Sequence, residues 1–163
     1  MRFLSLVVSL LAMLAFNASA VAEETADKTI VEGVKAKTLP ILKALSLIGT
    51  PYKFGGNNPE KGLDCSGFVK HVYKESADIS LPRSAAEMST QGEIVSQAEL
   101  KPGDLVFFNT RKKPNSHVGI YAGDGTFVHA SSSRTKEVTV SRIGEKYWAN
   151  RFNGARRVLP AAE

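Results

Sequence analysis

The spacing of apolar residues changes once along this chain, at Pro102-Gly103. Before this point apolar residues recur at intervals of three or four, as in helices, and after it they alternate, as in half-buried strands. Five short strands are predicted, at residues 104–108, 117–121, 126–131, 137–143 and 156–159. Helices followed by strands predict an α+β fold, in which N-terminal helices pack on an antiparallel sheet of about five strands.

Three helices are predicted before residue 102. The first is followed by a loop rich in glycine, asparagine and proline, then by a helix that contains the cysteine, and then by another short helix. The first spans 38–49, with Pro40 in its first turn and a glycine at its end. The last spans 84–91 and begins with Ser84 and Glu87, the Ser-x-x-Glu pattern of a capping box. We expect the first helix to pack on the core through Ile41, Leu42, Leu45 and Ile48.

The single cysteine of the chain, Cys65, lies at the predicted first turn of a helix that ends near Glu75. Asp64 precedes it and is a suitable N-cap. The unpaired N–H groups and the macrodipole of a helix N-terminus favour the thiolate, which is the nucleophilic form of cysteine. One cysteine cannot form an internal disulfide, so packing must hold the fold together. A buried, inert thiol is the alternative, and a base within reach of Cys65 decides between the two.

Two histidines, His117 and His129, lie on neighbouring predicted strands, with residues 122–125 between them. A loop of odd length would make the two imidazoles direct cross-strand neighbours, whereas a two-residue Asp-Gly turn would put them on opposite faces. Covalent acyl transfer requires a nucleophile, a base and an orienting group. In that scheme Cys65 attacks a carbonyl, His117 accepts and returns the proton, and His129 holds His117 in the right tautomer.

Other chemistries have less support in the sequence. One cysteine and two histidines without a closely spaced ligand pair give little support to a zinc site, so no metal or cofactor is expected. His71 lies off the Cys65 line of its helix and is expected to be structural. The net charge of +5 suits a polyanionic surface and is equally an ordinary solubilising charge. No basic run contains interleaved aromatic residues, so a nucleic-acid partner is not expected.

The N-terminus has the features of an export signal. Arg2 precedes an apolar run at 3–16, and Ala18-Ser19-Ala20 has the small-x-small form of a cleavage site. The run is too short for a comfortable membrane span, so no membrane anchor is expected. The predicted organisation is a cleaved signal peptide at 1–20, a flexible leader at 21–37 and one domain at 38–163. We expect a monomer that is exported to the periplasm or secreted.

Six segments, taken together and in this order, resemble the NlpC-type cell-wall cysteine peptidases: 49–56, 64–68, 81–84, 102–108, 116–121 and 127–131. The resemblance runs from about residue 39 to residue 159. The tail at 145–158 is similar to that of the single-domain Gram-negative members of this family. The resemblance implies a papain-like α+β fold and metal-free hydrolysis of peptide bonds in the stem peptides of peptidoglycan.

The resemblance also implies roles for individual residues. Cys65 matches the nucleophile of the family, His117 matches its base and His129 its third polar residue. Four further positions match residues beside the nucleophile or along the substrate groove: Tyr52, Asp64, Ser66 and Arg83. The bond that is cut stays open between D-alanyl-diaminopimelate and γ-D-glutamyl-diaminopimelate. The alternatives are a non-catalytic peptidoglycan-binding or scaffolding domain and a different thiol acyl transfer.

Overall fold

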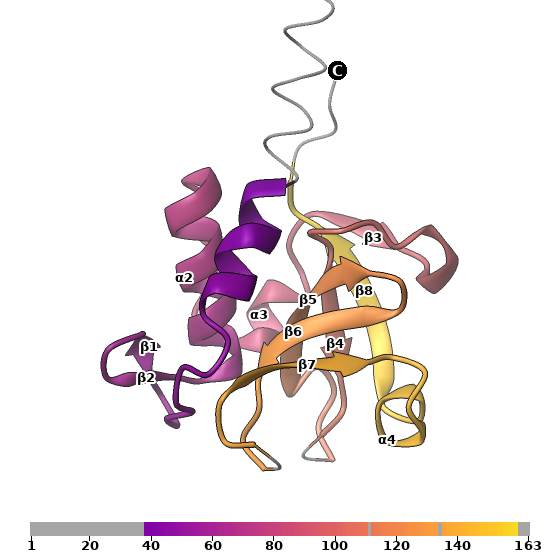
Figure 1. Cartoon of the computed structure of the whole chain (residues 1–163). Coiled ribbons are helices and arrows are strands. Elements are labelled where there is room, and N and C mark those ends of the chain that lie inside the picture. Colours follow the sequence, from indigo (N-terminus) through magenta and orange to yellow (C-terminus); the bar gives the residue numbers. More distant parts are fainter. Residues whose placement is uncertain (1–37, 111, 134, 160–163) are drawn as a thin grey trace, which may run out of the picture. The chain divides into compact units, whose positions relative to one another are not determined.

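The computed structural model describes residues 38–110, 112–133 and 135–159 (Figure 1). The predicted signal peptide and leader at 1–37 lie outside these residues. No helix in the described ranges is long and apolar enough to cross a membrane. The domain predicted at 38–163 is therefore described for nearly all of its length.

The described helices are a first helix at 38–46, α2 (Cys65–Ala77), α3 (Ala85–Met88), α4 (Lys146–Ala149) and a 3₁₀ turn, η1 (Gln97–Glu99). Two very short strands, β1 (Asn57–Asn58) and β2 (Gly62–Leu63), pair within the loop between the first helix and α2. The main strands are β3 (Glu93–Val95), β4 (Leu105–Phe108), β5 (His117–Gly123), β6 (Thr126–Ala130), β7 (Val138–Arg142) and β8 (Phe152–Arg157).

The main sheet of the described part has the strand order β3-β8-β4-β5-β6-β7, and every neighbouring pair is antiparallel. It has one strand more than the expected five, because β3 pairs along β8. The three residues of β3 include Ile94, which is 80% exposed, so the segment lacks the alternating burial that makes a strand visible in a sequence. The last strand, β8, also begins earlier than the predicted range of 156–159.

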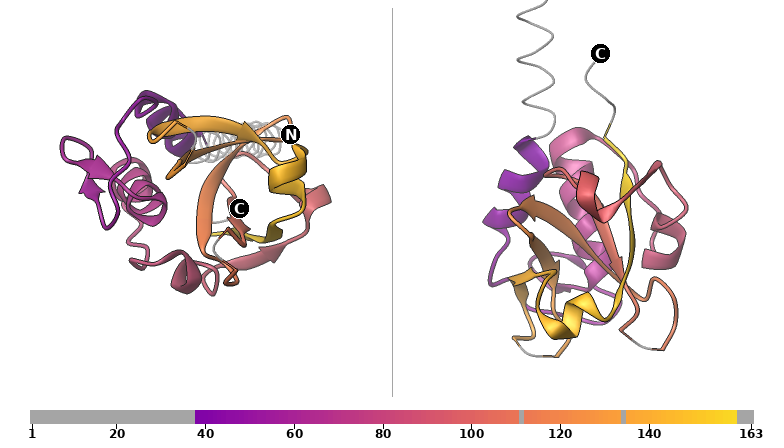
Figure 2. Two further views of the ribbon diagram at one scale, coloured as in Figure 1. Left: turned by 90° about the horizontal axis from the view of Figure 1, so that it is seen from below. Right: turned by 90° about the vertical axis from the view of Figure 1, so that its right-hand side faces the viewer.

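Helices lie on both sides of the main sheet, α2 on one side and α4 on the other (Figure 2). Apolar side chains are buried on both faces of the sheet. On one face α2 packs against β5 and β6 through Phe68, Val69 and Val72, which recur at helical spacing and are fully buried. On the other face, Trp148 of α4 packs with Phe108 of β4 and Phe127 of β6. These layers confirm the α+β prediction of helices on an antiparallel sheet.

The first helix turns a different face to the core from the predicted one. Ala44 is fully buried and Ile41 is partly buried, whereas Leu42, Leu45 and Ile48 are 57%, 40% and 48% exposed. Apolar residues occur at helical spacing on both faces of this helix, so periodicity alone could not choose between them. The face that packs on the core contains Ala44, together with the partly buried Ile41 and Leu47.

The hairpin between β5 and β6 decides where the two histidines point. Its turn is the two-residue Asp124-Gly125, both with positive φ, which predicts opposite faces for His117 and His129. The register shifts between Tyr121 and Gly123, so Ala122 is an extra residue in β5. Because this bulge adds one residue to β5, it places both histidines on the same face of the sheet. They are diagonal neighbours, because the register places Gly119 opposite His129. The structure therefore has neither of the two expected arrangements, direct pairing or opposite faces.

Gly119 provides a test of this register. A Cβ at this position would lie 2.7 Å from Cδ2 of Phe127 and 2.9 Å from the carbonyl oxygen of Val128. We expect Gly119→Ala to lower the free energy of unfolding by about 1–3 kcal/mol through overpacking, measured by urea denaturation. Gly144→Ala is the matched control, since no described atom lies within 4 Å of its added Cβ, and its effect should stay within about 0.5 kcal/mol. Equal effects of the two substitutions would contradict this packing.

Candidate active site

Cys65 is the first residue of α2, as predicted. The backbone of Asp64 is extended, and its carboxylate accepts a hydrogen bond of 2.7 Å from the N–H of Gly67. This N-cap satisfies one of the N–H groups that the first turn of a helix leaves without a partner. The thiol of Cys65 therefore lies at the positive end of a thirteen-residue helix, which favours its ionised form.

Asp64 also accepts hydrogen bonds from two other segments of the chain. Arg83 binds its two carboxylate oxygens with both terminal nitrogens, at 3.0 and 2.7 Å, and Gly55 donates its N–H at 3.0 Å. The hydroxyl of Ser66 donates to Asp64 at 3.2 Å and accepts from Arg83 at 2.9 Å. Burial alone would raise the pKa of Asp64, but these hydrogen bonds and the charge of Arg83 outweigh it and lower that pKa.

The predicted groove residues line one cleft of about 610 Å³. Its described lining includes Tyr52, Phe54, Cys65, Ser66, Arg83 and Ser116. The hydrogen bond with Asp64 is the main cause of the raised pKa of Arg83, and Coulomb interactions with Cys65 and Tyr52 add to it. The guanidinium thus lies within electrostatic range of the thiol, and its positive charge favours a thiolate.

The two predicted histidines form a hydrogen-bonded pair. Nε2 of His117 lies 2.9 Å from Nδ1 of His129, and Nε2 of His129 lies 3.0 Å from the hydroxyl oxygen of Ser141. The indole ring of Trp148 stacks on His117, with ring centroids 5.4 Å apart. Only 6% of His117 and 1% of His129 are exposed. A chain of hydrogen bonds therefore runs from the buried His117 through His129 to the partly buried Ser141.

The protonation state of His129 follows from its burial. Burial, together with the neighbouring His117, holds the pKa of His129 well below its usual range, so this ring is neutral near pH 7. A neutral imidazole has one N–H and one acceptor nitrogen. If Nδ1 of His129 accepts from His117, its Nε2–H donates to Ser141. The same arrangement leaves Nδ1 of His117 to act as the acceptor on its other side.

Sequence reasoning missed two residues of this arrangement, Ser141 and Trp148. Ser141 is one of several hydroxyl residues in the segment 131–141, and no local pattern distinguishes it. Trp148 lies in the tail that resembles the family, but its stacking on His117 depends on where α4 packs. His71 lies in α2 and, as predicted, takes no part in the histidine pair. Among the described residues, no group of three or more histidines, cysteines and carboxylates could hold a metal.

Comparison with known proteins places this arrangement in a family. Residues 49–157 match the model of the NlpC/P60 family, and the chain belongs to that family, as its sequence motifs predicted. It is 47% identical over 118 residues to gamma-DL-glutamyl hydrolase of Bacillus subtilis, covering 72% of this chain and 28% of that protein. It is 41% identical over 132 residues to murein DD-endopeptidase MepS/murein LD-carboxypeptidase of Escherichia coli, covering 81% and 68%.

The fold of the chain is also similar to that of a solved member of the family. A crystal structure of an NlpC/P60 family protein from Bacillus cereus superposes with a TM-score of 0.70 at 32% identity, covering 76% of this chain and 40% of that one. The chain thus spans less than half the length of the Bacillus subtilis and Bacillus cereus proteins. What it shares with them is the NlpC/P60 domain.

The buried, neutral His129 makes stability depend on pH. Below about pH 6.5 the unfolded chain binds a proton on this histidine that the folded protein does not bind. We therefore expect His129 to make the free energy of unfolding fall as the pH falls, by up to about 1.4 kcal/mol per pH unit, and to have no such effect above that range. Urea denaturation between about pH 7.5 and 5 measures the slope.

Two variants test whether His129 causes this dependence of stability on pH. His129→Asn should remove most of it, because asparagine does not titrate. His71→Gln should remove less, since burial, the main cause, and the charge of Lys43 also lower the pKa of His71, but this side chain is only partly buried. An unchanged slope in His129→Asn would mean that His129 is protonated equally in both states.

Proposed function

We propose that this protein is a peptidoglycan endopeptidase that hydrolyses peptide bonds in stem peptides or their cross-links through a cysteine thioester. The observation that carries the proposal is the position of Cys65, at the capped N-terminus of α2 and in a cleft with Ser116, the residue before His117. Relatives named as hydrolases of γ-DL-glutamyl and murein bonds support the substrate class. The proposed bond is D-alanyl-diaminopimelate or γ-D-glutamyl-diaminopimelate.

In the proposed reaction the thiol of Cys65 gives its proton to Nδ1 of His117, and the sulfur attacks the scissile carbonyl carbon. His117 then returns the proton to the leaving nitrogen as the C–N bond breaks, and an acyl thioester forms. Water hydrolyses the thioester with His117 as the base, which regenerates the thiol. The reaction consumes one water and needs no cofactor.

His129 is the proposed orienting residue. By accepting a hydrogen bond at 2.9 Å from Nε2 of His117, it would keep Nδ1 of His117 available to the thiol. It would also stabilise the imidazolium that forms on His117, through a neutral acceptor rather than a charge. Trp148, stacked on His117, limits the access of water to this hydrogen bond.

The remaining predicted site residues have proposed roles in the cleft. Tyr52 and the backbone N–H of Cys65 are candidate donors to the oxyanion of the tetrahedral intermediate. Asp64, Ser66 and Arg83 are proposed to contact the acyl half of the substrate, and their mutual hydrogen bonds keep them in place. We further propose that residues 1–20 direct export to the periplasm or beyond the cell, and that the protein acts as a monomer.

Digestion of sacculi tests the nucleophile and identifies the bond. Diaminopimelate-type sacculi are incubated with the wild-type protein or with Cys65→Ala, and the products are identified by mass spectrometry. We expect the wild type to release fragments and the variant to lose all detectable hydrolysis, because alanine cannot form the thioester. Monomers from cross-linked dimers would indicate the D-alanyl bond, and shortened dipeptide stems would indicate the γ-D-glutamyl bond.

Two outcomes of the digestion would reject the proposal. Hydrolysis by Cys65→Ala at the wild-type rate would exclude Cys65 as the nucleophile. Binding of both proteins to sacculi without any product would favour a non-catalytic peptidoglycan-binding domain. Circular dichroism of the variant provides the control for folding.

Ser141 should act as a positioning residue for His129. Ser141→Ala removes the acceptor for the Nε2–H of His129, and we expect kcat to fall about tenfold with little change in KM, the equivalent of one lost hydrogen bond. Ser141→Thr keeps the hydroxyl and should retain most of the activity. The acid limb of the pH–rate profile should also shift in Ser141→Ala, which a purely structural effect would not produce. Equal activity of the alanine and threonine variants would contradict this role.

A further inference from the structure

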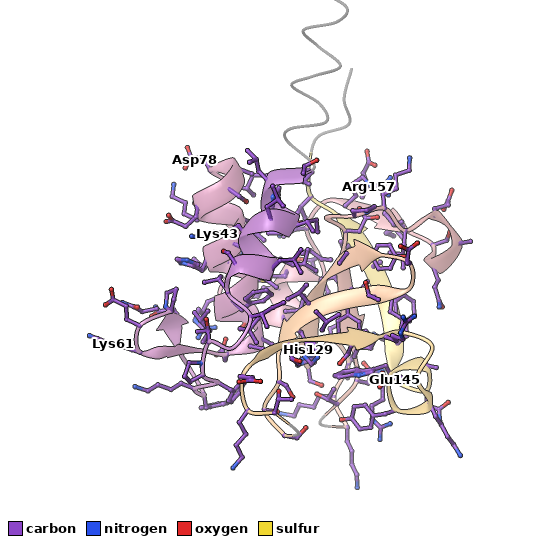
Figure 3. The ribbon with its side chains drawn as sticks, viewed as in Figure 1. Lys43, Lys61, Asp78, His129, Glu145 and Arg157 are labelled. Atoms are coloured by element: carbon purple, nitrogen blue, oxygen red, sulfur yellow. The ribbon has the colours of Figure 1, made fainter. Side chains whose placement is uncertain are left out.

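The loop between β4 and β5 places a lysine, Lys113, at the wall of the Cys65 cleft. Residues 113–116 all line this cleft, and the last of them directly precedes His117, the proposed base. Figure 1 shows this loop at the lower end of the sheet, and Figure 3 shows the side chain of His129 near the same end. The loop therefore forms the part of the cleft wall that leads to the histidine pair.

Hydrogen bonds of Asn115 fix the end of this loop. Its backbone N–H donates to Oδ1 of Asn109, at the end of β4, at 3.0 Å. Its side-chain amide donates to the hydroxyl of Ser89, after α3, and accepts from Asn153 of β8, both at 2.8 Å. Its φ of 50° is in the left-handed region, which asparagine adopts more readily than most residues. The loop is thus attached to three other segments just before β5 begins.

The backbone of Lys113 is restricted as well. Lys113 precedes Pro114, and a residue before proline is disfavoured in the α region and adopts an extended conformation. The ring of Pro114 fixes its own φ, and Asn115 is anchored one residue further on. The lysine side chain is exposed, but the chain presents it at the cleft from a restricted backbone. A ligand that contacts Lys113 therefore has little backbone left to order.

The charge of Lys113 is not offset within the cleft. The other two ionic side chains of the described lining, Asp64 and Arg83, pair with each other at 2.7 Å. No carboxylate in the described part of the chain forms an ion pair with Lys113. Proton transfer from the thiol to His117 adds no net charge, because it produces one anion and one cation. The cleft therefore complements a ligand with an anionic group.

We propose that Lys113 binds a free carboxylate in the acyl half of the substrate and so contributes to its specificity. The inference rests on the proposed function. A γ-D-glutamyl bond uses the side-chain carboxyl of glutamate, so the α-carboxylate of that residue stays free. Diaminopimelate within a stem also keeps one of its two carboxylates free, and it belongs to the acyl half when the D-alanyl bond is cut. Both candidate acyl halves therefore contain a group that Lys113 can bind.

Binding of a stem tetrapeptide tests this role. Isothermal titration calorimetry measures the affinity of the Cys65→Ala protein for L-alanyl-γ-D-glutamyl-diaminopimelyl-D-alanine. Two further peptides are amidated, one at the glutamyl α-carboxylate and the other at the free diaminopimelate carboxylate. We expect Lys113→Gln to weaken the binding of the unmodified peptide about fivefold, the size of one exposed ion pair. One amidated peptide should bind about as weakly, and Lys113→Gln should not weaken its binding further, because the partner charge is already absent.

The neighbouring lysine provides the matched control. Lys112→Gln removes the same charge from the same loop, but Lys112 is not among the described residues that line the cleft, so the affinity should stay unchanged. The difference between the protein with Lys113 and its glutamine variant should shrink as salt rises from about 0.05 to about 0.5 M, because salt screens an exposed ion pair. The amidated peptide that loses affinity identifies which carboxylate Lys113 binds.

The outcomes separate this inference from the proposed function. Equal binding of all three peptides, equal effects of Lys112→Gln and Lys113→Gln, or no binding of the unmodified peptide would overturn the role of Lys113, even in a protein that hydrolyses sacculi. Binding that depends on Lys113 and on one carboxylate, in a protein that hydrolyses nothing, would overturn the proposed function and leave the cleft as a stem-peptide-binding site.

Discussion

The carboxylate of Asp64 is the interaction on which the arrangement of the Cys65 cleft depends. It caps α2, accepts the N–H of Gly55 from the preceding loop and pairs with Arg83 from the segment after α2. A buried carboxylate without these donors would be costly, so the loop, the helix and Arg83 must assemble together. The thiol of Cys65 thereby acquires both a helix N-terminus and a nearby guanidinium, two features that favour its ionised form.

The second half of the site depends on a single extra residue, Ala122. Without the bulge, the two-residue turn between β5 and β6 would send His117 and His129 to opposite faces. With it, Nε2 of His117 lies 2.9 Å from Nδ1 of His129, and the hydrogen bonds continue to Ser141 of β7. The orienting group of the proposed reaction is thus held in place by residues of three neighbouring strands, β5, β6 and β7.

Much of the fold could be predicted from the sequence, because the signals are local. The N-cap Asp64, the capping box at Ser84 and the short apolar runs of β4 to β7 involve residues a few positions apart, and the structure has these elements close to where they were expected. The prediction was wrong for the exposed edge strand β3, for the start of β8 and for the buried face of the first helix. Each of these depends on a distant segment that lies alongside, which a local pattern cannot indicate.

The sequence by itself determined the type of chemistry that this protein offers: one cysteine behind a helix cap, two histidines on adjoining strands, and the motifs of the NlpC/P60 family. Only the tertiary structure decided that His117 and His129 are diagonal neighbours, and that Ser141 and Trp148 contact this pair. The physical reason is that caps and periodicity act within one or two turns, whereas distances between strands follow from register, and one bulged residue changes the register of a whole strand.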